Sequence, residues 1–111
     1  VQANGAKVVT HLLKDIDMGN LRKLSDLLKQ KLPSAVLILG AQTQADVSLL
    51  IAVTDDLVAK GIKANELVAQ AAAIMQGSGG GRPDMAQAGG KNPALVNAAM
   101  LKTKEAVMAK L

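Results

Sequence analysis

The sequence contains no phenylalanine, tyrosine, tryptophan or cysteine among its 111 residues. Without cysteine the chain can form no disulfide bond, no thiolate nucleophile and no cysteine-ligated zinc site, which fits a reducing compartment such as the cytoplasm. Without aromatic rings it cannot stack nucleic-acid bases on aromatic platforms, a contact worth about 1–3 kcal/mol per base. A nucleic-acid partner must therefore be held by cations, backbone amides and shape.

Long apolar runs are missing as well. The longest runs, at 35–39 and 47–53, are far shorter than the roughly 20 residues that a bilayer-spanning helix requires. Residues 1–10 lack the basic start and apolar segment of a signal peptide. We therefore expect no membrane partner and a cytoplasmic location.

Residues that could carry out catalysis are few and scattered. His11 is the only histidine, and strand alternation places it on the same side as Val9 and Leu13, so we expect a structural role. Asp55 and Asp56 are adjacent and point to opposite sides of an extended segment, so a turn or a helix cap explains them better than a carboxylate pair. We therefore expect this chain to be non-catalytic, with no metal site and no cofactor.

The apolar residues that are present predict one domain with several strands. Half of the 111 residues are hydrophobic, which is enough for a single core. Residues 7–14 form a β-branched and aliphatic run bracketed by lysines, which predicts a strand. The runs at 35–39 and 47–53 are typical of strands covered on both faces, and the polar link at 40–46 suits a hairpin.

Three segments have helical spacing. Asp17 is a plausible N-cap for a helix that ends before Pro33 and repeats leucine at positions 21, 24, 28 and 32. A second amphipathic helix covers 67–75, with Gly77 as its expected C′ residue. Asn92 and Pro93 predict the start of a third, whose inner face carries Val96, Met100, Val107 and Leu111.

The order of these elements predicts an α/β fold. We expect a single domain with a mixed β-sheet, flanked by about three helices, and a glycine-rich loop before the last helix. That loop, 77–90, holds six of the ten glycines. We expect it to be ordered, and Gly80→Val to cost about 1–3 kcal/mol if Gly80 has a strained backbone.

The glycine-rich segment does not match the common phosphate-binding loops. Arg82 stands where the dinucleotide fingerprint requires glycine, and Asn92 follows Lys91 where a P-loop requires serine or threonine. Gly79, Gly80 and Gly81 can nevertheless expose backbone amides beside the Arg82 guanidinium, which together would grip a phosphate or carboxylate. A tight packing turn is the alternative interpretation.

The charge is moderately basic and unevenly distributed. The net charge is +4, and residues 77–111 contribute +3 of it, from five basic and two acidic residues. Such a bias is compatible with a phosphate backbone as partner, and it is equally common on plain solvated surfaces.

The segment Gly79-Gly-Gly-Arg-Pro-Asp-Met-Ala-Gln-Ala-Gly-Gly90 resembles the hallmark stretch near the C-terminus of alanyl-tRNA synthetases. The resemblance extends upstream through 53–61 and the helix from Lys63, and downstream to the closing helix. It implies a C-terminal domain of the DHH-associated type, which is shared with DHH phosphoesterases. In those enzymes histidine follows the glycine triplet, whereas Arg82 stands here, and the Asp-His-His motif is absent.

The resemblance also implies a function. The C-terminal domain of that family binds the outer corner of tRNA(Ala), helps to bring the upstream aminoacylation and editing domains of the same chain onto one tRNA, and in some members supports a homodimer. The parent would be an alanine–tRNA ligase, with ATP and zinc expected only in the upstream domains. The alternatives are the substrate-binding half of a DHH phosphoesterase, or a protein-protein or dimerisation module.

The residues expected to contact nucleic acid fall into two groups. The motif residues are Gly79, Gly80, Gly81, Arg82 and Gln87. Arg22, Lys23 and Lys91 are expected from their charge to contact the phosphate backbone.

Overall fold

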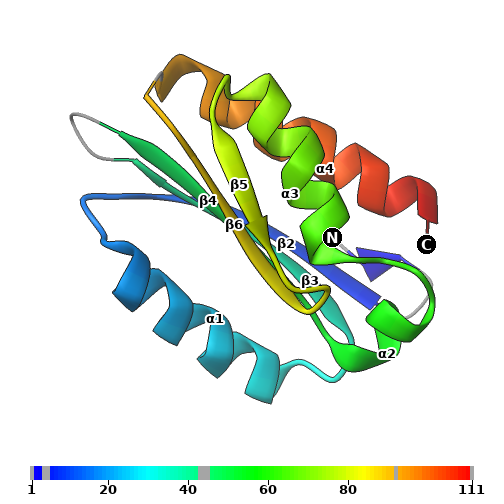
Figure 1. The fold of residues 1–111 in the computed structure, drawn as a ribbon. Coiled ribbons are helices and arrows are strands. Elements are labelled where there is room, and N and C mark those ends of the chain that lie inside the picture. The colour runs from blue at the N-terminus through cyan, green and yellow to red at the C-terminus, as the bar shows by residue number, and fades with distance from the viewer. Residues whose placement is uncertain (1, 4–5, 43–45, 92, 111) are drawn as a thin grey trace.

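The chain folds into three layers, with a mixed sheet between helices, as the computed structural model shows for residues 2–3, 6–42, 46–91 and 93–110 (Figure 1). The strands are β1 (Gln2–Ala3), β2 (Ala6–Lys14), β3 (Ala35–Gln42), β4 (Val47–Val53), β5 (Ser78–Gly81) and β6 (Met85–Gly90). Their order across the sheet is β1-β2-β3-β4-β6-β5. Only β2 and β3 are parallel; the other neighbours are antiparallel. This confirms the expected mixed sheet.

The helices lie on both faces of the sheet. They are α1 (Met18–Lys31), α2 (Asp55–Ala59), α3 (Ala64–Ile74) and α4 (Val96–Lys110), with a 3-10 turn η1 (Pro93–Leu95) before the last. Helix α1 covers one face, and α3 and α4 lie side by side on the other (Figure 1). The short α2 links β4 to α3 at one end of the sheet (Figure 1).

The boundaries of α1 confirm the expected capping. The Asp17 carboxylate accepts a hydrogen bond from the backbone N–H of Asn20 at 2.8 Å, which satisfies one of the free donors of the first turn. The helix ends at Lys31, two residues before Pro33. Leu21, Leu24 and Leu28 pack against the sheet, with Leu21 fully buried.

Strands β3 and β4 form the centre of the sheet as an antiparallel pair, from Val36 opposite Val53 to Gln42 opposite Val47. The expected hairpin is thereby confirmed for its strands, while its residues 43–45 lie outside the described part of the chain. Alternation divides the buried residues between two cores. Ile38 and Ile51 face α3 and α4, whereas their neighbours face α1.

The glycine-rich segment forms two strands, so the expected loop is wrong. Strands β5 and β6 make a hairpin whose turn is closed by the Arg82 N–H bonding to the Met85 carbonyl at 2.9 Å. Glycine has little intrinsic strand preference, but it allows backbones to approach closely. A Cβ at Gly77 would lie 1.8 Å from the carbonyl oxygen of Gly89, so only glycine fits there.

The end of α3 also differs from the prediction. The left-handed C′ residue is Gln76, with φ of 58°, and Gly77 occupies C″. The N–H of Gln76 bonds to the Ala73 carbonyl at 3.3 Å and that of Gly77 to the Ala72 carbonyl at 3.0 Å, which is a Schellman motif. Gly77 is therefore required for its contact with β6 rather than for a positive φ.

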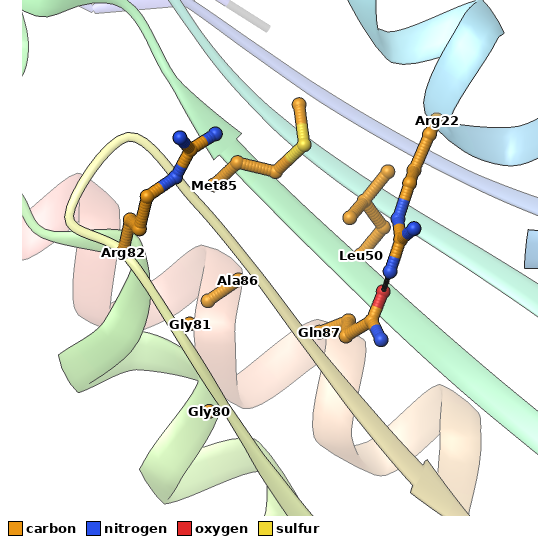
Figure 2. Close-up of a pocket in the computed structure, with 8 residues that line it drawn as sticks. All are labelled: Arg22, Leu50, Gly80, Gly81, Arg82, Met85, Ala86 and Gln87. Carbon is orange, nitrogen blue, oxygen red and sulfur yellow. Dashed lines mark hydrogen bonds between the residues drawn. The ribbon is translucent and has the colours of Figure 1, made fainter. Parts of the chain in front are cut away.

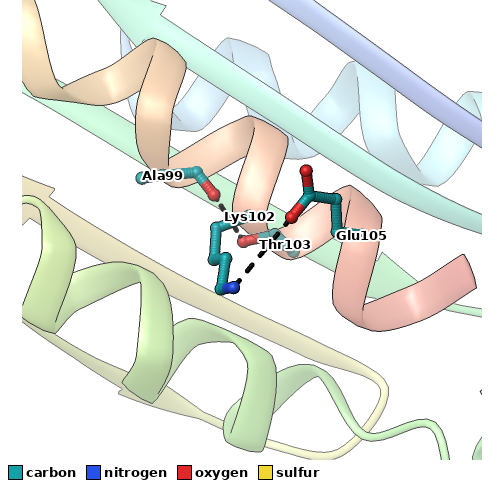
Figure 3. A network of polar contacts seen from close by, with 4 residues as sticks. All are labelled: Ala99, Lys102, Thr103 and Glu105. Carbon is teal, nitrogen blue, oxygen red and sulfur yellow. Dashed lines mark hydrogen bonds and ion pairs between the residues drawn. The ribbon is translucent and has the colours of Figure 1, made fainter. Parts of the chain in front are cut away.

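Helix α4 buries the residues that its spacing predicts. Val96, Met100 and Val107 are buried, whereas Asn92, the expected cap, and Leu111 lie outside the described residues. Thr103 is also buried, and its hydroxyl donates to the Ala99 carbonyl at 2.8 Å (Figure 3). On the solvent side, Lys102 and Glu105 form an ion pair at 4.0 Å (Figure 3).

Candidate nucleic-acid interface

One face of the β5–β6 hairpin is open. Helix α1 packs mainly on β3 and β4 rather than on β5 and β6. Leu50, which belongs to the core beneath α1, lies opposite Gln87, and Gln87 lies opposite Gly80. Because paired residues share a face of the sheet, Gln87 and Gly80 face the same side as α1. A Cβ built on Gly80 would meet no atom of the described residues within 4 Å.

A shallow groove of about 320 Å³ lies between α1 and this hairpin (Figure 2). It contains five of the eight residues that the sequence predicted to contact nucleic acid, brought together from α1 and from the glycine-rich segment. Its lining consists of Arg22, Leu50, Gly80, Gly81, Arg82, Met85, Ala86 and Gln87.

A side-chain hydrogen bond joins the two walls of the groove. The Arg22 guanidinium, on α1, donates to the Gln87 Oε1, on β6, at 2.5 Å (Figure 2). The two residues are 65 positions apart in the sequence. Both side chains are accessible to solvent, and the planar guanidinium has further N–H groups that remain able to donate. Gln87 therefore positions Arg22 beside Gly80, which forms the floor of the groove.

Arg82 marks the tip of the hairpin. Its side chain is 76% exposed and lies 3.5 Å from the Asp84 carboxylate. An ion pair this exposed contributes little, so Arg82 can turn toward another anion at small cost. Arg82 and Arg22 thus place two guanidinium groups along one groove (Figure 2).

The three neighbouring glycines have different roles, which corrects the expectation of a strained Gly80. Gly81 has φ of 154°, and a Cβ there would lie 2.6 Å from the Ala86 Cα. A Cβ at Gly79 would lie 2.7 Å from the Ala88 Cβ. Gly80 has neither a positive φ nor a close neighbour. Gly79 and Gly81 are therefore required for packing, whereas Gly80 keeps the groove floor open.

The groove continues along the hairpin as a chain of hollows, which we call the hairpin track. The next hollow shares Gly80 and Gln87 with the groove, and a third shares Ser48, Ser78 and Gly89 with the second. The third hollow ends at Lys91. The six residues of β6 span roughly 20 Å, at about 3.3 Å each. The track therefore has Arg22 and Arg82 toward one end and Lys91 at the other.

Lys23 is the predicted residue that lies apart. It is exposed on α1 next to Arg22 but does not line the groove. Leu50, Met85 and Ser48 line the track although the sequence did not indicate them. These residues could be predicted only from the pairing of β4 with β6, and that pairing can be predicted only if residues 85–90 are recognised as a strand.

Thr54 and Asp56 have structural roles. Asp56 accepts hydrogen bonds of 2.6 Å from the hydroxyls of Ser34 and Thr54, which hold the pKa of its carboxyl below the ordinary 3.8. Thr54 also accepts from the Ala35 N–H at 3.1 Å and is the N-cap residue of α2, so the aspartate pair lies at a helix start as expected. His11 shares the side of Val9 and Leu13 but is exposed rather than packed.

Within the described residues, no group of three or more histidine, aspartate or glutamate side chains is placed to hold a metal ion. In the same part of the chain, no helix is long and apolar enough to cross a membrane.

Comparison with known families agrees with the fold and the motif. The DHHA1 domain model matches residues 5–110, and the chain belongs to this family. Within the family, the chain is of the kind found at the C-terminus of alanyl-tRNA synthetases. It is 27% identical to the C-Ala domain of the alanyl-tRNA synthetase of Aquifex aeolicus, with a TM-score of 0.83 over 91% of this chain and 90% of that one.

Sequence relatives point the same way. The chain is 46% identical over 107 residues to the alanine–tRNA ligase of Alkaliphilus oremlandii and 49% identical over 111 residues to that of Aromatoleum aromaticum. These matches cover 96% and 100% of the chain but only 12% and 13% of the relatives. A DHH domain from a member of a family of ribosomal proteins shares the fold alone, at 12% identity and a TM-score of 0.59 over 89% of this chain and 25% of that one.

Proposed function

We propose that this domain binds the outer corner of tRNA(Ala) through the hairpin track and helps to couple aminoacylation with editing in a parent alanine–tRNA ligase. The parent would act in the cytoplasm, with its ATP and zinc sites in upstream aminoacylation and editing domains. The domain itself would perform no chemistry. Its family membership and its likeness to the C-Ala domain support this proposal.

The observation that carries the proposal is the bond between Arg22 and Gln87. This bond holds the Arg22 guanidinium of α1 over the floor of the groove, where Gly80 has no side chain. A guanidinium fork matches phosphate oxygens in two simultaneous hydrogen bonds. A floor without a side chain lets a sugar-phosphate backbone approach closely. Together these features suit recognition of a folded RNA by its backbone.

Two substitutions test the track with little effect on the fold. Gly80→Val places a branched side chain on the floor of the groove, where nothing lies within 4 Å to oppose it. Arg22→Ala removes the guanidinium from an exposed helix position. We expect both variants to keep the melting temperature and to weaken tRNA(Ala) binding. Lys102→Ala, at an exposed lysine on the opposite helical layer, is the matched control and should leave binding unchanged.

Salt dependence and competition complete the test. Each phosphate contact should contribute roughly −0.7 to −0.9 to the slope of log affinity against log salt, so about three contacts give a slope near −2 to −3. A folded tRNA should compete better than a single strand of equal length. Equal competition by the single strand would instead favour the substrate-binding half of a phosphoesterase. Salt-independent binding, or unchanged binding by Gly80→Val, would contradict the proposed surface.

A further inference from the structure

The second hollow of the hairpin track carries hydroxyl groups and no charge. Its volume is about 330 Å³, and its polar side chains are those of Ser48, Ser78 and Gln87. None of the residues that line it is ionisable, whereas the groove beside it contains Arg22 and Arg82. Because cations are the strongest partners of a phosphate group, this hollow suits a neutral part of a nucleic acid.

Strand pairing places the two serines on either side of Gly89. Ser48 of β4 and Ser78 of β5 both pair with Gly89 of β6, so the three residues form one row across the sheet. Ser48 lies two residues from Leu50 and Ser78 two residues from Gly80, so both side chains point to the face that bears α1. Neighbouring strands are about 4.8 Å apart, which separates the Cα atoms of the two serines by roughly 10 Å.

The floor between the two serines is open. A Cβ built on Gly89 would lie 3.7 Å from the Val47 carbonyl oxygen, an ordinary contact, and would meet no other atom of the described residues within 4 Å. Gly89 therefore leaves space above the sheet, as Gly80 does in the groove. Ser78 is exposed and Ser48 is half-buried, and both line the hollow, so a ligand can reach both hydroxyls.

We propose that Ser48 and Ser78 bind ribose 2′-hydroxyl groups, so that the hairpin track distinguishes RNA from DNA. This inference rests on the proposed function, because it requires a sugar-phosphate backbone that lies along the track. A serine hydroxyl both donates and accepts hydrogen bonds, as does a 2′-hydroxyl, whereas deoxyribose offers neither at that position. The serine row lies two residues, or about 7 Å, beyond Gly80 along β5. A ribose that adjoins a phosphate held by Arg22 therefore reaches this row.

The far end of the track also favours a sugar beside the serines. The third hollow shares Ser48, Ser78 and Gly89 with the second and adds Asp46 and Lys91. The Asp46 carboxylate would repel a phosphate placed beside the serines, whereas it can accept a hydrogen bond from a hydroxyl group. Lys91 lies just past the end of β6, where it attracts a phosphate farther along the backbone.

The ligand that tests the proposal is a tRNA(Ala) in which fluorine replaces every 2′-hydroxyl. Fluorine cannot donate a hydrogen bond, but it leaves the phosphate charge and the A-form sugar geometry in place. We expect the unaltered chain to prefer the unmodified tRNA(Ala), and Ser48→Ala combined with Ser78→Ala to lose this preference. The preference of the unaltered chain should exceed that of the double variant by about 5-fold or more, the value for one net hydrogen bond. Any change in tRNA folding affects both proteins alike and cancels from this comparison.

Two further variants serve as controls. Ser34 is also half-buried, but it lies outside the track and its hydroxyl donates to the Asp56 carboxylate at 2.6 Å. Ser34→Ala should therefore keep the full preference for the unmodified RNA. Ser78→Thr retains a hydroxyl at an exposed strand position and should keep the preference as well, whereas Ser78→Ala alone should reduce it.

Salt separates this inference from the proposed function. The affinity for either RNA should fall as salt rises, whereas the ratio of the two affinities should stay constant, because neutral groups make the contact. An equal preference in the unaltered chain and the double variant would overturn the ribose contacts and leave salt-dependent tRNA binding intact. If the unaltered chain bound neither RNA, the proposed function itself would be overturned, and the ribose contacts with it.

Discussion

Gly77 and Gly80 lie three residues apart in one glycine-rich segment, yet alanine should have opposite effects at the two positions. A Cβ at Gly77 would lie 1.8 Å from the Gly89 carbonyl oxygen and 2.8 Å from the Gly89 carbonyl carbon. Ordinary contact begins at 3.4 Å, so the backbones must separate by about 1.6 Å. Neither neighbour is a flexible side chain that could turn aside.

The loss in free energy of unfolding caused by Gly77→Ala can be estimated from these distances. Overpacking in a well-packed region costs typically about 1–3 kcal/mol and sometimes more. Because the clash is between backbones of a Schellman turn and a strand, we expect about 3 kcal/mol or more. Such a loss lowers Tm by roughly 10 °C or more for a domain of this size. Gly80→Ala meets no atom within 4 Å and should be neutral, or stabilising by up to about 1 kcal/mol through the unfolded state.

Urea unfolding of the two variants and the unaltered chain measures the difference. The midpoint should fall strongly for Gly77→Ala and stay equal or rise for Gly80→Ala, with the same m-value in all three. Equal midpoints for the two variants would refute the assignment of distinct roles to these glycines. A larger loss at Gly80 would show that the open floor of the groove is a packed turn.

Three further predictions concern stability. Gln76→Gly should stabilise the domain by about 1 kcal/mol in urea unfolding, because Gln76 has a left-handed φ of 58°, a conformation that glycine adopts at little cost. Ser25→Ala should be neutral or stabilising by about 1 kcal/mol by the same measurement, because the buried Ser25 hydroxyl has no hydrogen-bond partner among the described residues and alanine favours the helix. The pKa of Asp56 is lowered in the folded state, so its stabilising contribution is present above the ordinary value of 3.8 and is lost as pH falls through the folded-state pKa. The difference in Tm between the unaltered chain and Asp56→Asn should therefore shrink below about pH 3.8.

Hydrophobic pattern was sufficient to predict the centre of the fold. The runs at 35–39 and 47–53 are buried on both faces, so nearly every residue had to be apolar, and that signal survives in the sequence alone. The leucine spacing after Asp17 predicts α1 because one helical face covers the sheet and the cap bonds locally. In both cases the cause lies in the residues of the segment itself.

The glycine-rich hairpin could not be predicted in the same way. Residues 78–81 carry almost no side chains, so they have no apolar alternation to detect. Their strand geometry comes from β6, and that of β6 from β4, which is distant in the sequence. The bond between Arg22 and Gln87 depends on the same pairing, so charge indicated Arg22 and the motif indicated Gln87, but neither predicted their contact.

Alternation along this hairpin explains how one glycine triplet can serve both stability and the proposed binding of RNA. Gly79 and Gly81 pair with Ala88 and Ala86, whose side chains face α3 and α4, and each lies too close to its neighbour to accept a Cβ. Gly80 pairs with Gln87 on the other face, where a Cβ at Gly80 would meet none of the described residues within 4 Å. The close packing of Gly79 and Gly81 fixes β5 in place. This packing also sets the position of Gly80, on the other face of β5, relative to Arg22. A side chain at Gly80 should therefore change what the proposed binding surface can accept without loosening the hairpin.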